Sequence, residues 1–446
     1  MDMDVRETSL WDTFRLQFFL TLLGFLWGLV APNRFFVWCL SRWDAGRATI
    51  RFLGDLRSKY RCDHLWVWFP LGKALFVKTL LVMDPDSVDA VLRSDENAAD
   101  PTLKKRALSG FVPDALVISS GDEWKDRRPF NESALGFGKL HRHHDAFKEI
   151  VFREVDRLTA ERVGALRWPD FQRLGERISH QVILGSGQVE PEMTVRLARL
   201  VRRSNWGVLP RNRRAFAVFY DRLERHLGQQ PVPPSCLMHD SAMALAKGSA
   251  TSITQVPRQI GFWFFVLKDA IELHVARTLA LIAAHQEVQS RLRREIREAP
   301  KATAQAIDEF AFLNACIEEQ LRLWTPVPIL LRRAVKPFSL RGITIQPEQQ
   351  ILIHTGAYHR DSRFFGQAAD SFSPDSASGA LRRVYFFSAH RQSCAGQFLV
   401  RFLLKATLVS LLARFRFELI APGITPGPIP CLIDHFRIEL RTHRDG

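Results

Sequence analysis

The longest helical pattern in the chain runs from Ile260 to Arg297, where apolar residues recur at the spacing of one very long helix. A helix of about 20 residues already spans a small domain, so the remaining elements have to pack around this one. Similar spacing predicts shorter helices over residues 147–160, 169–184, 215–227, 304–323 and 396–415. Three prolines between residues 228 and 236 forbid a regular helix there and predict a loop.

Short alternating segments predict a small amount of β-structure in the last third of the chain. The predicted strands cover residues 333–334, 338–340, 343–345, 350–354, 417–420 and 436–440. The sequence holds no glycine-rich loop of the dinucleotide or P-loop type. We therefore predict a mainly α fold with a small β portion, and we exclude a Rossmann or P-loop nucleotide enzyme.

The charge is strongly basic, with a formal net charge of +15 over 446 residues. Only 13 of the 62 basic residues are lysine, and no zinc finger, RNA-binding aromatic motif or long basic run accompanies them. Nucleic acid is therefore not an expected partner. The six cysteines are widely spread and form no CxxC pair, which argues against a disulfide framework or a structural zinc site and favours a reducing compartment.

An apolar run near the N-terminus predicts a membrane anchor. No charged residue lies between Leu16 and Asn33, and residues 18–31 are almost wholly apolar. A spanning helix needs about 20 apolar residues, so the run is marginal and either a spanning or a monotopic anchor fits it. The acidic start and the lack of a small-residue cleavage site argue against a secretory signal. A buried N-terminal helix is the alternative.

Basic residues predict the orientation of this anchor. Arg34, Arg42, Arg47 and Arg51 follow the apolar run, whereas two arginines precede it. By the positive-inside rule, the bulk of the chain stays on the cytoplasmic side. We therefore predict an anchor over residues 1–42, a large catalytic domain over residues 43–446, and a membrane-associated protein.

A cysteine loop carries the most informative candidate chemistry. Cys394 lies in a loop and Gly396 follows it, just before the predicted helix 396–415. Backbone N–H groups near a helix start favour a thiolate, which a nucleophile or a metal ligand needs. Taken alone, the residue could equally be a buried structural cysteine.

Two further pairs accompany the cysteine. Glu319 and Arg322 lie three residues apart on one predicted helix face, where they can form an ion pair, although such pairs are usually solvated. Trp124 and Arg128 place an indole and a guanidinium four residues apart.

In order and spacing, these motifs resemble those of the haem-thiolate cytochrome P-450 superfamily. The resemblance covers about residues 43–446. It implies the fold of that family, with a long central helix over a haem and a proximal cysteine loop. The motifs that match are W-x-x-x-R at 124–128, H-x-E-V-Q at 285–289, E-x-x-R at 319–322, H-R-D at 359–361, F-x-P at 372–374 and F-x-x-x-x-x-x-C-x-G at 387–396.

The resemblance implies a role for each matching residue, with haem b as the cofactor. Cys394 would be the axial thiolate ligand of the iron. Trp124, Arg128 and Arg332 would bind the haem propionates through charge-assisted hydrogen bonds. Phe387 would pack against the cysteine loop and Gly396 would let the following helix approach the porphyrin, while Glu319 and Arg322 would form a buried structural pair.

The sequence departs from the family pattern around the cysteine. His390 stands where the family usually has glycine, and Gln392 stands where it usually has arginine or histidine. Arg391 could reach a propionate instead. Ser376 replaces the arginine expected after F-x-P, so the cluster around Glu319 looks incomplete.

The departure with most consequence lies in the central helix. Counting back from His285, the family's acid–alcohol pair falls on Asp269 and Ala270, so the acid is present and the alcohol is absent. In the family, that hydroxyl helps to relay protons during dioxygen activation. A substrate hydroxyl or an ordered water could replace it.

The resemblance implies a monooxygenase that inserts one oxygen atom from O2 into a hydrophobic small molecule. Two alternatives stay open: a peroxygenase, isomerase or dehydratase that does not activate O2, and a catalytically silent haem-binding protein. An apolar pocket is expected to contain Phe262, Phe265, Val266, Ile329 and Leu330.

No flavin or nicotinamide motif occurs in the sequence, so electrons are expected from a separate ferredoxin or flavoprotein reductase. This partner would dock on a basic face around the cysteine loop. The basic residues expected there are Arg382, Arg383, Arg391, Arg401 and Lys405.

Overall fold

The protein is described by a computed structural model. The structure describes residues 5–27, 31–69, 77–94, 108–162, 164–204, 211–229, 231–299, 303–378, 383–425 and 427–444.

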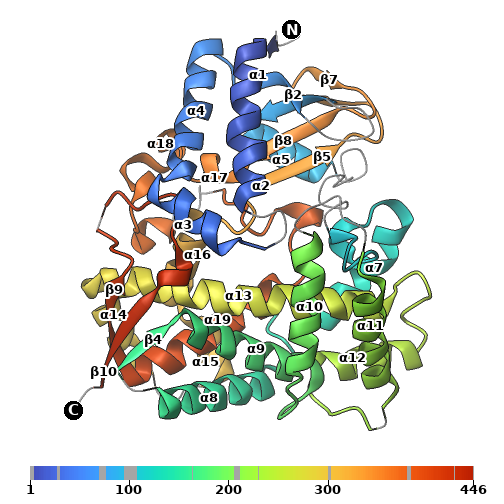
Figure 1. The fold of residues 1–446 in the computed structure, drawn as a ribbon, viewed down its shortest axis with the longest axis vertical. Helices are drawn as coiled ribbons and strands as arrows, with labels where there is room; N and C mark the ends of the chain where they lie inside the picture. The colour runs from blue at the N-terminus through green and yellow to red at the C-terminus, as the bar shows by residue number, and fades with distance from the viewer. Residues whose placement is uncertain are drawn as a thin grey trace.

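Helices form most of the molecule and gather around α13 (Val256–Ala284), which crosses its middle (Figure 1). The N-terminal helices are α1 (Leu10–Leu16), the π-helical turn η1 (Gln17–Leu22), α2 (Leu23–Trp27), α3 (Arg34–Arg42), α4 (Ala45–Tyr60) and α5 (Pro85–Arg93). The helices before α13 are α7 (Gly121–Leu135), α8 (His144–Glu161), α9 (Trp168–Leu184), α10 (Pro191–Ser204), α11 (Arg213–Gly228) and α12 (Leu237–Ala246). Those after it are α14 (Gln286–Glu298), α15 (Ala304–Glu309), α16 (Ala311–Leu323), α17 (Thr355–Tyr358), α18 (Ser362–Phe365) and α19 (Gln397–Arg414).

Three sheets make up the smaller β portion. The largest has the strand order β1-β2-β3-β8-β5 and lies beside α1 and α4 (Figure 1). A second sheet has the order β4-β10-β9, and β6 and β7 form a hairpin. The strands are β1 (Arg6–Glu7), β2 (His64–Phe69), β3 (Val77–Val82), β4 (Ala165–Arg167), β5 (Ile329–Arg333), β6 (Phe338–Leu340), β7 (Ile343–Ile345), β8 (Gln350–His354), β9 (Phe415–Ala421) and β10 (Glu439–Arg444).

The central helix is shorter than the sequence pattern predicts. His285 has φ −121° and ψ 84°, so the helix ends at Ala284 and α14 begins at Gln286. The Nδ1 atom of His285 lies 2.8 Å from the carbonyl oxygen of Leu281, so the imidazole forms a hydrogen bond with a carbonyl group in the last turn of α13. The apolar spacing continues through the break, and periodicity alone therefore does not reveal it.

A glycine lets α9 approach the central helix closely. A Cβ at Gly175 would lie 3.0 Å from the carbonyl oxygen of Lys268 and 3.1 Å from Cβ of Glu272. Such contacts are tighter than ordinary packing, so a larger residue would push the two helices apart. The position of α9 thus depends on this glycine.

The N-terminal apolar segment packs against the large sheet along one of its faces. Leu16, Leu20 and Leu23 are buried, and Asp12 accepts hydrogen bonds from Lys59 Nζ (2.6 Å) and from the hydroxyl of Tyr60 (2.7 Å) on α4. None of the helices that the structure describes is both long and apolar enough to cross a membrane.

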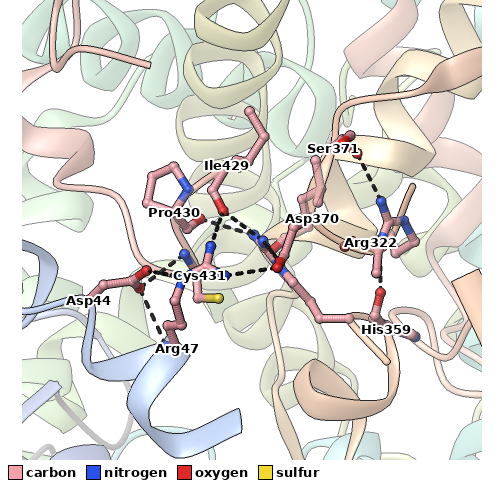
Figure 2. A network of polar contacts seen from close by, with 12 residues as sticks. Asp44, Arg47, Arg322, His359, Asp370, Ser371, Ile429, Pro430 and Cys431 are labelled. Atoms are coloured by element: carbon pink, nitrogen blue, oxygen red, sulfur yellow. Dashed lines mark hydrogen bonds and ion pairs between the residues drawn. The ribbon is translucent and has the colours of Figure 1, made fainter. Parts of the chain in front are cut away.

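A polar network joins the start of the chain to its end (Figure 2). Arg47 donates to Asp370 Oδ2 at 2.8 Å and to the carbonyl oxygen of Ile429 at 2.9 Å. Asp44 accepts from the backbone N–H of Cys431 at 3.0 Å. At Gly46 a Cβ would lie 2.9 Å from Cβ of Cys431, so only glycine permits this approach. The beginning of α4 is thereby fixed to the loop before η6 (His435–Arg437).

Candidate functional site

The loop that presents Cys394 is closed by a backbone hydrogen bond. The N–H of Cys394 donates to the carbonyl oxygen of Phe387 at 2.8 Å, and the ring of Phe387 is partly buried in the main core. Of the six cysteines, two are buried, three are half-buried, and Cys394 is exposed. Its sulfur is therefore the most accessible one to a ligand.

The family's glycine position in this loop keeps a glycine-like backbone. His390 has φ +54° and Ser388 has φ +57°, both in the left-handed region that L-residues avoid. The Nε2 atom of His390 lies 3.2 Å from Asp89 Oδ1 on α5, which holds the imidazole in place. The departure noted in the sequence thus places a histidine at a left-handed position of the loop.

The predicted Trp124–Arg128 pair lies against the cysteine loop. Arg128 donates to the carbonyl oxygen of Ser393 at 2.6 Å and to Glu132 Oε1 at 2.7 Å. The guanidinium carbons of Arg128 and Arg391 each lie 5.9 Å from the centre of the Trp124 ring. The structure therefore brings all three predicted residues together, and it adds Glu132, a partner that the motif itself does not include.

Arg332 approaches the same loop from β5. Its Nε donates to Gln392 Oε1 at 2.7 Å, and a second nitrogen donates to the carbonyl oxygen of Leu331 at 2.9 Å. Burial lowers the pKa of Arg332 to about 10. Within the described residues no acidic side chain opposes this shift, and Gln392 Nε2 is buried without an acceptor.

These two residues provide a test of whether haem fits the site. A half-buried guanidinium with a lowered pKa beside an unpaired amide N–H group favours an anionic acceptor, because burying either group alone is costly. A propionate carboxylate would accept hydrogen bonds from both groups. The residues present around Cys394 therefore fit a haem, and Gln392 joins Arg332 as a candidate propionate ligand.

Gly396 caps the N-terminal end of α19 with φ −94°. A Cβ there would meet Leu135 at 3.6 Å, which is ordinary van der Waals contact. Neither the backbone angle nor the protein neighbours require glycine. Its predicted role toward the porphyrin stays a prediction.

Glu319 and Arg322 form a buried pair, as the resemblance implies. They are 1% and 2% exposed, and Arg322 donates to both carboxylate oxygens at 2.7 Å. Arg322 also donates to the carbonyl oxygens of His359 at 2.6 Å and Ser371 at 3.1 Å (Figure 2). The backbone N–H of Ser373 donates to Glu319 at 3.1 Å. The pair therefore fixes the segment that leads to the cysteine loop.

The residues of the central helix that are predicted to line a pocket are partly accessible. Phe262, Phe265, Val266 and Asp269 are half-buried, whereas their neighbours Trp263, Phe264 and Leu267 are fully buried. Phe265 contacts Phe111 with ring centres 5.1 Å apart. Positions three or four residues apart share one helix face. The four residues thus share one partly accessible stretch of α13, and their position toward a haem stays a prediction.

Asp269 is only partly accessible. Its side chain is 38% exposed, and burial raises its pKa. Ala270 follows it on the same helix and provides no hydroxyl, as the sequence indicates.

The sequence motifs do not predict two charged neighbours of Asp269. Lys268 Nζ lies 2.6 Å from Glu272 Oε2 and 3.7 Å from Asp269 Oδ1. Burial lowers the pKa of Lys268, but the two carboxylates outweigh it and hold the pKa above its usual value. Charged residues in an otherwise apolar helix were the signal that could have revealed this cluster.

The two pocket positions predicted on β5 face different sides of the sheet. Ile329 packs with the N-terminal helices, whereas Leu330 is 8% exposed and packs in the cluster beneath α5. Side chains alternate along a strand, so both cannot project into the same pocket from a regular strand. Whether either one touches substrate stays a prediction.

The predicted basic face is less basic than the sequence implies. Lys405 is 4% exposed and its Nζ lies 2.6 Å from Asp308 Oδ1, so it does not contribute to the surface as predicted. Arg401 pairs with Glu318 at 3.0 Å and Arg383 with Asp86 at 2.5 Å. Arg382 lies outside the described residues.

The fold and this site define a class of protein that solved structures already represent. The chain superimposes on retinoic acid-bound cyanobacterial CYP120A1 with a TM-score of 0.71, at 17% identity, covering 88% of this chain and 94% of that one. The mainly helical fold is therefore that of the cytochromes P450.

Sequence comparisons agree with the fold. The Cytochrome P450 family model matches residues 274–431. Cytochrome P450 72A11 of Arabidopsis thaliana is 22% identical over 404 residues, which cover 80% of this chain and 78% of that protein. Cytochrome P450 714C2 of Oryza sativa subsp. japonica is 32% identical over 186 residues, covering 40% of this chain and 35% of that protein. The chain belongs to the cytochrome P450 superfamily.

Proposed function

We propose that this P450 is a haem-thiolate monooxygenase that inserts one oxygen atom from O2 into a hydrophobic small molecule. One observation carries the proposal: the exposed Cys394 lies in a loop that Arg128 and Arg332 both contact, beside an unpaired Gln392 amide. This combination offers a thiolate for iron and cationic groups for propionates.

Different residues of the protein would have different roles in this reaction. When bound, the haem supplies the redox chemistry that the side chains lack. Arg332 and Gln392 would hold a propionate, and Arg128 would hold the cysteine loop through the Ser393 carbonyl. Burial raises the pKa of Asp269, and its carboxylate would accept and pass on protons in this reaction.

The apolar face of α13 supports a hydrophobic substrate. Phe262, Phe265 and Val266 are partly accessible on the face that also presents Asp269. Apolar side chains with a few polar groups are typical of small-molecule pockets. We propose that the substrate lies over these residues.

Ala270 favours a second candidate function, an enzyme that uses peroxide or rearranges its substrate without activating O2. We expect Ala270→Thr to lower the hydrogen peroxide released per O2 consumed by several-fold, because a positioned hydroxyl assists proton transfer. Oxygen uptake and peroxide release would be measured with a surrogate reductase.

The matched control is Ala270→Val, which has the shape of threonine without its hydroxyl. If threonine and valine gave the same ratio of peroxide to O2 as alanine, the missing hydroxyl would be irrelevant. Turnover supported by peroxide but by no reductase would favour the second candidate.

We propose that electrons come from a separate protein that docks near the cysteine loop. Arg391 in the loop and Arg401 on α19 are candidate surface cations there. Complementary charge would mainly raise the association rate. Arg401 also pairs with Glu318.

We further propose that the protein associates with the cytoplasmic side of a membrane through an N-terminal apolar face. Phe18 of η1 and Trp43, which directly follows α3, join its two parts, with ring centres 6.3 Å apart. Isolated exposed apolar residues are common, but a contiguous patch of this kind favours a lipid or protein partner. The face consists of Leu10 (86% exposed), Trp11 (66%), Phe14 (65%), Phe18 (37%), Phe35 (62%), Trp38 (41%) and Trp43 (54%).

The double variant Trp11→Ser, Phe14→Ser is expected to bind phosphatidylserine-containing vesicles at least about tenfold more weakly than wild type. Each buried aromatic ring contributes roughly 1.5–3 kcal/mol, and 1.4 kcal/mol corresponds to a factor of ten. Vesicle co-sedimentation would measure this. The control is Ile420→Ser on β9, which removes an apolar residue of 40% exposure elsewhere. Equal losses in both variants would contradict the proposed face.

A further inference from the structure

The central helix carries a deeply buried arginine without a counter-ion. Arg277 is 6% exposed, and its guanidinium carbon lies 5.9 Å from the centre of the Trp324 ring. Its Nε is fully enclosed, and among the described residues no acceptor bonds to it. By contrast, the buried Arg322 and Arg360 each donate to a carboxylate at 2.7–2.8 Å.

No carboxylate compensates the charge of Arg277 from a distance either. Burial lowers its pKa to about 9, and no other group among the described residues shifts it. The nearby Asp434 interacts instead with Arg437 and Arg34. A buried, uncompensated cation is expensive, so the site favours an anion.

Further unpaired polar atoms lie on residues that interact with Arg277 or with its neighbours. His435 and Trp168 are 2% and 6% exposed with ring centres 4.8 Å apart, and His435 Nδ1 and Trp168 Nε1 both lack a partner among the described residues. The charge of Arg277 reaches His435, since it helps to hold the pKa of that imidazole low. His274 precedes Arg277 by three residues, and its Nδ1 atom lies 3.0 Å from Gln320 Oε1. Gln320 Nε2 also lacks a partner among the described residues.

The chemistry of these groups distinguishes an anion from a water molecule. The guanidinium, the indole N–H and the amide N–H are all donors, and His435 Nδ1 can become one. A buried water accepts such bonds but must also donate its own protons, whereas an anion only accepts. We propose that Arg277, Trp168, His435 and Gln320 form a buried binding site for a small anion, either a halide or a small carboxylate.

The site is separate from the residues assigned to the haem. Arg277 follows Ala270 by seven residues, which is about 10 Å along a helix. It lies where α13, α9 and η6 meet, and Trp27 of α2 approaches with its ring centre 6.4 Å from that of His435. The proposal therefore does not depend on the proposed reaction.

The test is thermal unfolding of the full-length purified protein at constant ionic strength, with sodium fluoride replaced stepwise by chloride, bromide or acetate. A specifically bound anion should raise Tm by about 1–2 °C per tenfold increase in concentration above its Kd, as expected for a chain of this length. Stabilisation by chloride and bromide would identify a halide site, and stabilisation by acetate a carboxylate site. Arg277→Met should lose the dependence, whereas Arg441→Met, which alters a surface pair, should keep it.

Tm values that do not depend on the anion in wild type would overturn the proposal, as would an unchanged dependence in Arg277→Met. If that variant does not fold, bromide-soaked wild-type crystals decide. A peak of anomalous scattering beside Arg277 supports the site, and an ordered water without such a peak refutes it.

Discussion

Replacing Cys394 with serine is expected to abolish the strongly red-shifted Soret band of the dithionite-reduced protein under carbon monoxide. That band requires a thiolate opposite the gas, and Cys394 is the one exposed cysteine. Burial raises the pKa values of Cys236, Cys316 and Cys431, which keeps these thiols protonated and unsuited to ligation. The absorption spectrum of wild type and variant measures the effect directly.

Cys39→Ser serves as the matched control, because Cys39 is half-buried on α3 and far from the loop in sequence. It should keep the red-shifted band. A Cys394→Ser protein that also kept the band would refute the ligand assignment. A wild type whose band lies at the position of a neutral ligand would favour the functions that do not activate O2.

The second large effect is expected from Arg322→Met, which leaves Glu319 as a buried charge without its partner. Breaking a buried ion pair costs about 3–5 kcal/mol of unfolding free energy. The variant also removes donors from backbone carbonyl groups, including that of His359, and each buried unpaired acceptor adds about 1–3 kcal/mol. Urea unfolding should show a large fall in the midpoint.

Arg441→Met is the control for this experiment, since Arg441 and Glu418 are both about half exposed. Surface pairs of this kind contribute about 0–1 kcal/mol. Adding Glu319→Gln to Arg322→Met should restore part of the lost stability by removing the unpaired charge. Equal effects of Arg322→Met and Arg441→Met would mean that the buried pair does not stabilise the fold.

Much of the architecture could be predicted from the sequence. The strands at 338–340, 343–345 and 350–354 and the helix over 169–184 lie within one residue of their predicted bounds, because alternation and helical spacing are local signals. The breaks at His285 and Phe310 were not predicted. Each depends on a single residue leaving the helical region between two segments of helical spacing.

Part of the candidate site could likewise be predicted from the sequence, and part could not. Its motif residues could be predicted because chemistry fixes their type and spacing, and the structure brings Trp124, Arg128, Arg332 and Cys394 to one loop. The partners that complete it could not be predicted. Gln392 Oε1 meets Arg332 across 60 residues of sequence, and such a contact follows only from the packing of β5 against the loop.

The contacts between α4 and the loop before η6 also affect the order of synthesis and folding. Arg47 and Asp44 find their partners at Ile429 and Cys431, more than 380 residues later. Until the ribosome has added Ile429, α4 lacks part of the surface against which it packs, and Arg47 lacks the carbonyl oxygen to which it will donate. These contacts of α4 therefore form only after residues 429–431 have been synthesised.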